Sequence, residues 1–127
     1  MDVAIAPEEQ LANYLLESSK IKGTSVDHRA FLPGRDGERS VFRIDGLCKE
    51  LIATTGQAFV LENRPDKQIV GWAAFKAADV FGLNRLRLRA DEPPPRHAVI
   101  DNWPAEPEER RKLALELARA SECCLWP

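Results

Sequence analysis

The chain is 127 residues long, which fits one domain and leaves a second domain too small to hold a core of its own. Its hydrophobic fraction of 44% and its charged fraction of 30% exclude an intrinsically disordered chain, which would carry fewer apolar residues and a larger net charge. The formal net charge of -2 excludes a general attraction to nucleic acid or to an anionic membrane. We therefore expect a single folded domain over residues 1–127.

The sequence predicts a cytoplasmic protein. No stretch approaches the roughly 20 consecutive apolar residues that span a bilayer, and residues 1–6 carry an acid where a signal peptide carries basic residues. The cysteines Cys48, Cys123 and Cys124 are odd in number and two are adjacent, which makes a poor disulfide framework. We therefore expect free thiols, no membrane association and no cofactor.

Residues 7–20 predict the first helix. Pro7 suits the first helical position, and Glu8 suits the first turn, where the helix dipole favours negative charge. Leu11 and Leu15 lie one helical turn apart and form a narrow apolar stripe. We expect this stripe to pack on the sheet formed by the later strands.

A long connection and a short strand follow. Residues 24–39 show little periodicity and contain the turn signals Pro33–Gly34 and Asp36–Gly37. A structureless connection of this length is uncommon in a compact domain. The segment therefore either has a function or hides a short strand near residues 30–32. Residues 40–44 then alternate and predict a strand.

Residues 46–62 predict the second helix. Their apolar side chains recur at helical spacing, and Asp45 is a suitable N-cap. Gly56 lies in the middle and weakens a helix by about 1 kcal/mol relative to alanine. The alternative ends the helix at Gly56 and pairs residues 57–61 with residues 68–75 as a hairpin. We favour the continuous helix.

The next segments predict most of the sheet. Residues 69–75 are almost continuously apolar and indicate a buried strand, in which Gly71 marks the close approach of another element or a bulge. Residues 77–82 predict one helical turn, and residues 83–90 alternate as a half-buried strand with a basic outer face. After a rigid connection through three prolines, residues 97–100 predict a last short strand.

Residues 107–122 predict the final helix, whose leucines form an apolar stripe, and residues 123–127 are expected to be a tail. This order of elements is typical of an α+β fold. We expect a small, mostly antiparallel sheet of three or four strands, with about three helices packed on one face of it.

A row of arginines gives the clearest sign of a binding surface. Arg85, Arg87 and Arg89 lie on one face of the predicted strand, and Arg96 extends the row. Like charges on one strand face repel, so something must neutralise them. The neutralising negative charge could come from the same chain, from the acidic residues Glu62, Asp66, Asp91 and Glu92. We favour this intramolecular source; the alternative is a partner, for which an exposed Trp103 or Trp126 would be an anchor. We expect Trp72 in the core, and we favour Trp103 and Trp126 folded back to cap it.

The two histidines support an alternative, enzymatic function. His97 follows the prolines, and histidine serves as acid, base or ligand near neutral pH. His28 lies in the long connection, where sites often occur. With Asp36 or Asp45 the pair would form a hydrolase or nuclease-like site. No two of these residues show the spacing of metal ligands, so no metal is expected. A nucleophilic pair of Cys48 and His97 is a further alternative.

Short motifs in the chain resemble a pattern in uncharacterised bacterial proteins from mobile or defence-related gene neighbourhoods. The motifs are Phe31-x-Pro33, Gly37-Glu38-x-Ser40-Val41-x-Arg43, Pro94-Pro95-Arg96-His97-Ala98-x-Ile100 and Trp103-Pro104. Those proteins also end in a helix rich in alanine and leucine, here residues 112–120. The resemblance spans residues 28–121 and implies a bacterial accessory protein, without implying a reaction or a set of site residues.

We therefore expect a non-enzymatic accessory protein that binds another protein through the arginine-lined strand and the rigid proline-rich loop. A small hydrolase or nuclease-like enzyme is the alternative, less favoured because no catalytic motif is present. Nucleic acid is a less favoured partner, because no aromatic residues lie between the arginines. Self-association through a sheet edge is a third alternative.

Overall fold

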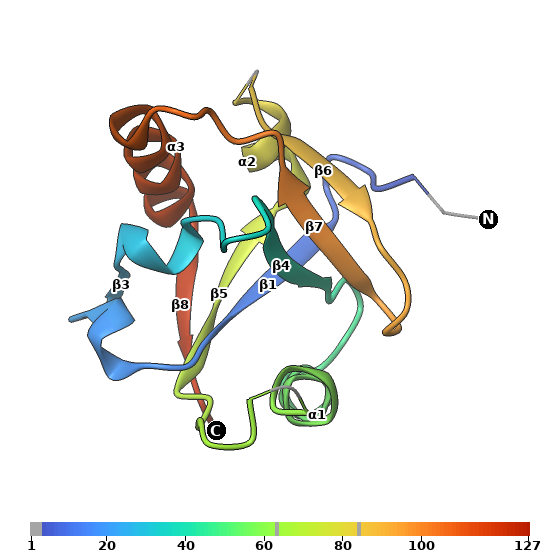
Figure 1. Cartoon of the computed structure of the whole chain (residues 1–127). Helices are drawn as coiled ribbons and strands as arrows, with labels where there is room; N and C mark the ends of the chain where they lie inside the picture. Colours follow the sequence, from blue (N-terminus) through green and yellow to red (C-terminus); the bar gives the residue numbers. More distant parts are fainter. Residues whose placement is uncertain (1–3, 63, 84) are drawn as a thin grey trace.

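The computed structural model describes residues 4–62, 64–83 and 85–127. Its centre is a six-stranded antiparallel sheet with the strand order β6-β7-β4-β1-β5-β8 (Figure 1). The strands of this sheet are β1 (Gln10–Leu15), β4 (Arg39–Arg43), β5 (Gly71–Lys76), β6 (Arg87–Ala90), β7 (His97–Asp101) and β8 (Glu122–Leu125). The predicted α+β fold is confirmed, but the sheet has six strands instead of three or four.

Helices and a small hairpin complete the fold. The helical elements are α1 (Lys49–Thr55), α2 (Ala77–Phe81), α3 (Pro107–Ala120), the 3-10 turns η1 (Ser18–Lys20) and η2 (His28–Phe31), and the π-helical turn η3 (Gly56–Val60). The hairpin consists of β2 (Ile21–Lys22) and β3 (Ser25–Val26). None of the helices in the described part of the chain has the length and apolarity needed to cross a membrane. Residues 1–3, from the segment 1–6 that was considered and rejected as a signal peptide, lie outside the described residues. Residue 84 of the predicted strand 83–90 also lies outside them.

Strand β1 lies in the middle of the sheet, between β4 and β5. The predicted helix over residues 7–20 is therefore wrong. Leu11 and Leu15 enter the larger of two cores, and Tyr14 enters the smaller core on the opposite face. Residues 11–15 are all buried. A strand that is apolar on both faces loses its two-residue alternation, and the spacing of its two leucines then imitates a helical stripe.

Strand β8 forms one edge of the sheet from residues that were expected to be a tail. It pairs with β5, where Gly71 lies opposite Leu125. A Cβ atom on Gly71 would lie 2.4 Å from the carbonyl oxygen of Cys124, so only glycine lets the two backbones approach this closely. The predicted close approach at Gly71 is confirmed, and β8 is the approaching element.

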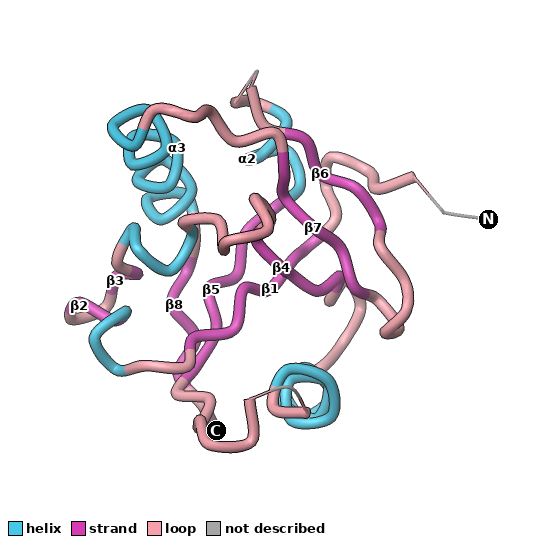
Figure 2. Tube along the Cα trace, viewed as in Figure 1, coloured by secondary structure: helices cyan, strands magenta, loops and turns pink. Residues whose placement is uncertain are grey.

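Helices cover both faces of the sheet, which corrects the expectation of a single covered face (Figure 2). The larger core lies under α2, α3 and η2 and includes the fully buried Phe31 and Leu117. The smaller core lies under α1 and η3 and includes Phe42 and Trp72. The predicted core position of Trp72 is thus confirmed.

The helix predicted over residues 46–62 forms, but it starts later and is less regular. Helix α1 begins after Cys48, which replaces Asp45 as the N-cap, and continues into the π-helical turn η3. A Cβ atom on Gly56 would lie 2.7 Å from the ring of Tyr14, so glycine lets the helix rest against β1. Because residues 56–60 are helical, the alternative hairpin of residues 57–61 with residues 68–75 is wrong.

The connection over residues 24–39 holds more structure than expected. It contains β3 and also η2, which lies where a hidden strand was considered. Phe31 of η2 meets the ring of Phe75 at a centroid distance of 5.4 Å. The connection is thereby anchored in the larger core before the chain enters β4 at Arg39.

The remaining elements agree closely with the sequence. The strands predicted at residues 40–44, 69–75 and 97–100 form as β4, β5 and β7, and the predicted helical turn and final helix form as α2 and α3. The basic strand is shorter than predicted, because β6 begins at Arg87.

Candidate binding site

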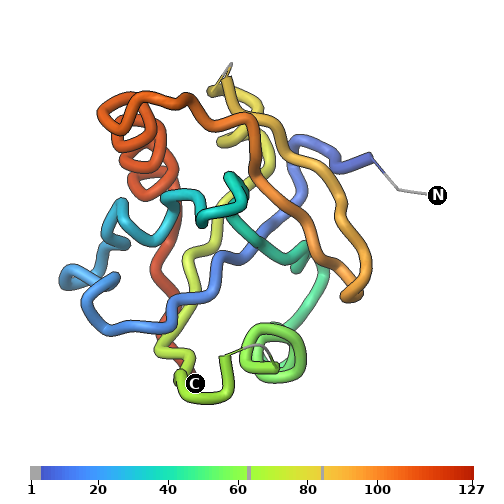
Figure 3. The backbone as a smooth tube through the Cα atoms, in the orientation of Figure 1, coloured from blue at the N-terminus to red at the C-terminus, as the bar shows by residue number. Residues whose placement is uncertain are grey.

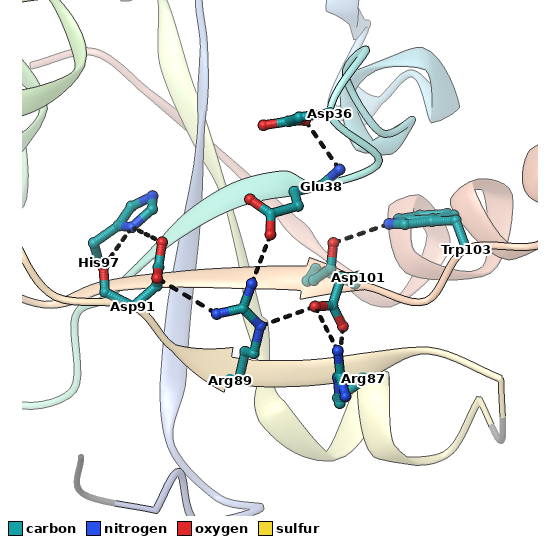
Figure 4. A network of polar contacts seen from close by, with 9 residues as sticks. Asp36, Glu38, Arg87, Arg89, Asp91, His97, Asp101 and Trp103 are labelled. Atoms are coloured by element: carbon teal, nitrogen blue, oxygen red, sulfur yellow. Dashed lines mark hydrogen bonds and ion pairs between the residues drawn. The ribbon is translucent and has the colours of Figure 1, made fainter. Parts of the chain in front are cut away.

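The arginines of β6 meet an aspartate on the neighbouring strand (Figure 4). The register of β6 and β7 places Arg87 opposite Asp101. Arg87 donates two hydrogen bonds to Asp101, from Nε to Oδ1 at 2.8 Å and from Nη2 to Oδ2 at 3.0 Å. Arg89 donates a third, from Nε to Oδ2 at 2.9 Å. Only 7% of Asp101 is exposed, so two guanidinium groups compensate one buried carboxylate.

Arg89 has two further acidic partners. Its Nη2 donates to Glu38 Oε2 at 2.6 Å, and its Nη1 donates to Asp91 Oδ1 at 3.4 Å. Of the four acidic residues suggested by the sequence, only Asp91 contributes to this network in the described part of the chain. Asp101 was missed because the last strand was expected to end one residue before it. The repulsion between Arg87 and Arg89 is therefore relieved inside the molecule.

These contacts keep the network ionised. Hydrogen bonds from Arg87, and secondarily from Arg89, hold the pKa of Asp101 below its ordinary value, against burial, which raises it. The hydrogen bond to Asp101 likewise raises the pKa of each arginine. The three charges therefore stabilise one another at neutral pH.

Arg85 and Arg96 do not join this network. Arg85 is exposed in the turn before β6, where its carbonyl oxygen accepts a hydrogen bond from Asn102 Nδ2 at 2.9 Å. Arg96 is exposed with a positive φ of 69°, and its backbone N–H donates to Glu92 Oε2 at 2.7 Å. The side chain of Arg96 lines a shallow depression with the acidic residues Glu8, Glu9, Asp45 and Glu92. The four arginines therefore do not form one row: Arg87 and Arg89 bind Asp101, whereas Arg85 and Arg96 lie apart from this network.

Trp103 folds back onto the protein. It is half-buried against the larger core, and its Nε1 donates to the carbonyl oxygen of Ile100 at 3.0 Å. Trp126 is also half-buried and meets the ring of Trp72 edge-on at 6.3 Å. The expectation that these tryptophans cap the cores is confirmed.

The two histidines have separate carboxylate partners. His97, at the start of β7, places Nδ1 2.9 Å from the carbonyl oxygen of Asp91 and 3.3 Å from Asp91 Oδ2. His28, in η2, places Nδ1 3.7 Å from Asp27 Oδ1. The cavity that His97 lines includes neither His28 nor Cys48. Within the described ranges, no group of three His, Cys, Asp or Glu side chains is arranged to hold a metal ion.

That cavity, of about 440 Å³, opens where β1 and β4 separate. β1 pairs with β5 through six residue pairs, but with β4 through only two, Leu11 with Arg43 and Ala12 with Phe42. Beyond Ala12 the two strands run apart, as the backbone trace in Figure 3 shows. The walls of the cavity come from β1, β4, η3 and the start of β7.

Arg39, at the start of β4, lines this cavity without a carboxylate partner. Its Nη1 donates to the carbonyl oxygen of Ala30 at 2.7 Å. Its Nε is buried and has no hydrogen-bond partner among the described residues. Burial lowers the pKa of the Arg39 guanidinium, and the attraction of Asp36 only partly offsets this. Because arginine keeps its charge in proteins, a half-buried cation is left with one buried donor, Nε, unused.

A second arginine lies near the first. Arg64 is exposed, lines the same cavity, and makes no side-chain ion pair within the described residues. Arg39 and Arg64 also line an adjoining cavity of about 180 Å³, together with Lys20. The carboxylate of that smaller cavity is Glu17, which already faces Lys20 at 3.7 Å. The charged residues that line both cavities are thus the two arginines, whereas the carboxylates of Asp36 and Glu38 line the larger cavity alone.

Aromatic side chains form another wall of the larger cavity. The rings of Phe42 and Phe59 lie nearly parallel, with centroids 6.3 Å apart, and Phe59 is the more exposed of the two. Tyr14 meets Phe42 edge-on at 5.8 Å, and its hydroxyl donates to the carbonyl oxygen of Ile52 at 2.6 Å, which fixes the ring. Polar side chains complete the lining: Asn13, Ser40 and His97, together with the carboxylates of Asp36 and Glu38.

Sequence reasoning singled out His97 but missed Arg39, Arg64 and the aromatic wall. Arg39 directly precedes a predicted strand, and nothing in its local pattern separates it from the chain's other arginines. Only the divergence of β1 from β4 makes it a cavity residue. Comparison with protein-family models, curated proteins and solved structures found no match for this chain.

Proposed function

We propose that this protein is a non-enzymatic binding protein that holds an anionic group of its ligand between Arg39 and Arg64. The observation that carries the proposal is the buried Nε of Arg39, which has no hydrogen-bond partner in the described chain. Leaving a buried cation without a partner is costly unless something else supplies negative charge. A guanidinium group presents a planar fork of donors that matches the oxygens of a carboxylate or a phosphate.

The nearest acidic side chains do not fill this role. Glu38 is held by Arg89 at 2.6 Å. Asp36 accepts the backbone N–H of Glu38 at 3.1 Å, and it attracts Arg39 without forming an ion pair. Arg39, which lines the cavity, therefore has no carboxylate partner among the described residues, which supports an external anion as the missing partner.

Thermal unfolding with inorganic phosphate, compared with chloride at equal ionic strength, tests the proposal. A ligand that binds only the folded state stabilises it by about 2.7 kcal/mol at a concentration of 100 times its Kd. We expect phosphate to raise the unfolding temperature of the wild type and to lose this effect in Arg39→Met. Arg35→Met, which changes an exposed arginine outside the cavity lining, is the matched control. Equal stabilisation of all three proteins would refute the site.

A protein partner at the open edge of the sheet is the second candidate function. β6 is one of the two edge strands, and 66% of the Arg87 side chain is exposed although it is paired with Asp101. An extended acidic segment of another protein could add to this edge through backbone hydrogen bonds. Co-purification from the native host with wild-type and Arg87→Glu protein tests this, and a partner retained equally by both would exclude the edge.

A further inference from the structure

We infer that the anion held at Arg39 belongs to a nucleoside phosphate, whose planar base lies against Phe59. This inference rests on the proposed function and adds the remainder of the ligand. Inorganic phosphate alone would leave most of a cavity of about 440 Å³ empty of ligand. A volume of that size falls within the range of small-molecule sites, roughly 300–1,000 Å³.

The aromatic wall provides a surface for a flat ring. Phe42 is almost fully buried, and its nearly parallel neighbour Phe59 is half-buried, so the accessible part of the wall is at Phe59. Tyr14 supports Phe42 from the side. Stacking of a base on an aromatic side chain contributes about 1–3 kcal/mol and tolerates any base, because every base has a π-face.

Polar groups beside this wall can orient the rest of the ligand. Nδ1 of His97 is engaged by the carbonyl oxygen of Asp91, which can only accept a hydrogen bond. A neutral ring would therefore carry its proton on Nδ1 and leave Nε2 as an acceptor. The exposed Ser40 lines the same cavity. Acceptors and hydroxyls of this kind suit the hydroxyl groups of a ribose or the amino group of a base.

The adjoining cavity extends the anion site. Arg39 and Arg64 line both cavities, so an anion bound between them can continue into the smaller one, beside Lys20. A phosphate chain fits this arrangement better than a carboxylate, because a second phosphate adds charge where cations are in excess. The structure therefore favours a nucleoside diphosphate over a monophosphate.

Calorimetric titration of the full chain with inorganic phosphate, pyrophosphate, AMP, ADP and indole-3-acetate tests the inference. We expect ADP to bind more tightly than AMP, and each nucleotide to bind about ten times more tightly than its inorganic counterpart, which corresponds to about 1.4 kcal/mol. Phe59→Leu keeps an apolar side chain of similar size but removes the ring, so it should abolish the nucleotide advantage and leave phosphate binding unchanged. Phe81→Leu, on the exposed surface of α2, is the control.

The outcomes separate the two proposals. Equal affinity for phosphate and for AMP, or an unchanged nucleotide advantage in Phe59→Leu, would overturn the inference while the anion site stands. Tighter binding of indole-3-acetate than of AMP would support a planar ring at Phe59 but overturn the inference that the anionic group is a phosphate. Binding of none of these compounds to the wild type would remove the proposed function, and the inference with it.

Discussion

The arginines of this protein fall into two groups that differ in how their charge is compensated. Arg87 and Arg89 lie on an edge strand with 66% and 40% of their side chains exposed, yet both bind Asp101. Arg39 lies deeper, and its buried Nε has no partner in the described chain. The sequence pattern indicated a binding role for the β6 arginines, which are neutralised inside the molecule. It indicated no role for Arg39, whose buried Nε is an unused donor.

Strand pairing explains the difference. In the β6–β7 hairpin, side chains directly opposite one another are close enough to pair, and Asp101 lies opposite Arg87. Arg39 stands where β1 has left β4, and the residue opposite it on β7 is the apolar Ile100, so neither neighbouring strand brings a carboxylate to it. Charges on directly opposed residues of paired strands can compensate one another, whereas Arg39 has no such partner among the described residues. Unfolding measurements on substituted proteins can test this contrast, beginning with the substitution of greatest effect.

Asp101→Asn should destabilise the protein most. It removes the charge that holds two arginines together and leaves them facing each other. Breaking a fully buried pair costs roughly 3–5 kcal/mol, and the exposure of both arginines reduces the expected loss to about 2 kcal/mol. Urea unfolding measures the loss. Asp66→Asn, at an exposed position, is the control, and equal effects of the two variants would contradict the role of the network.

At acidic pH the difference in stability between the wild type and Asp101→Asn should disappear. The arginines depress the pKa of Asp101 in the folded state, so its contribution is present above the unfolded pKa of about 3.9 and is lost as the pH falls through the folded pKa. We expect urea midpoints of the two proteins to differ equally at about pH 7 and pH 5 and to converge below about pH 4. A difference that disappears already near pH 5 would mean that Asp101 is not held ionised by the arginines.

Arg87→Ala should destabilise the protein much less than Asp101→Asn. Asp101 keeps its hydrogen bond from Arg89, and the guanidinium that is lost is the more exposed of the two. Added salt should shrink the effect further, because exposed charges are screened. Urea midpoints at low and high salt measure it. A loss as large as that of Asp101→Asn would show that Arg89 alone does not compensate the carboxylate.

Arg39→Met should have the smallest effect on stability, and it can be favourable. The substitution replaces a half-buried cation with an apolar side chain of similar length, and such replacements are often neutral or stabilising. The carbonyl oxygen of Ala30 keeps its hydrogen bond from Asn13 Nδ2 at 2.8 Å. Without phosphate, the free energy of unfolding of the variant should lie within about 1 kcal/mol of the wild-type value. A larger loss would mean that Arg39 is a structural residue, which would remove the contrast with Arg87.

Local pattern predicted the elements that have one buried face or a clear boundary. The alternation at β4 and β7, the helix ending in η3 and the final helix α3 were all visible in the sequence. Two strands of the main sheet were missed for different reasons. β1 is buried on both faces and therefore shows no alternation. β8 is short, and only its pairing with Gly71 of β5 makes it a strand.

The candidate site was predicted only in part. His97 was identified from its residue type and its place after the prolines. Arg39 carries no signal of its own, because its burial depends on Ala30 of the long connection and on the gap between β1 and β4. Cavities formed by diverging strands combine residues far apart in the chain, and no local periodicity reports their distance.

The sequence by itself predicted the α+β class, the main elements from β4 to α3 and a close approach or bulge at Gly71. Each of these depends on contacts within a few residues or on the chemistry of one side chain. The tertiary structure alone decided which arginines are compensated, because compensation depends on strand register between distant segments. It placed Asp101 beside Arg87 and left Arg39 facing a cavity.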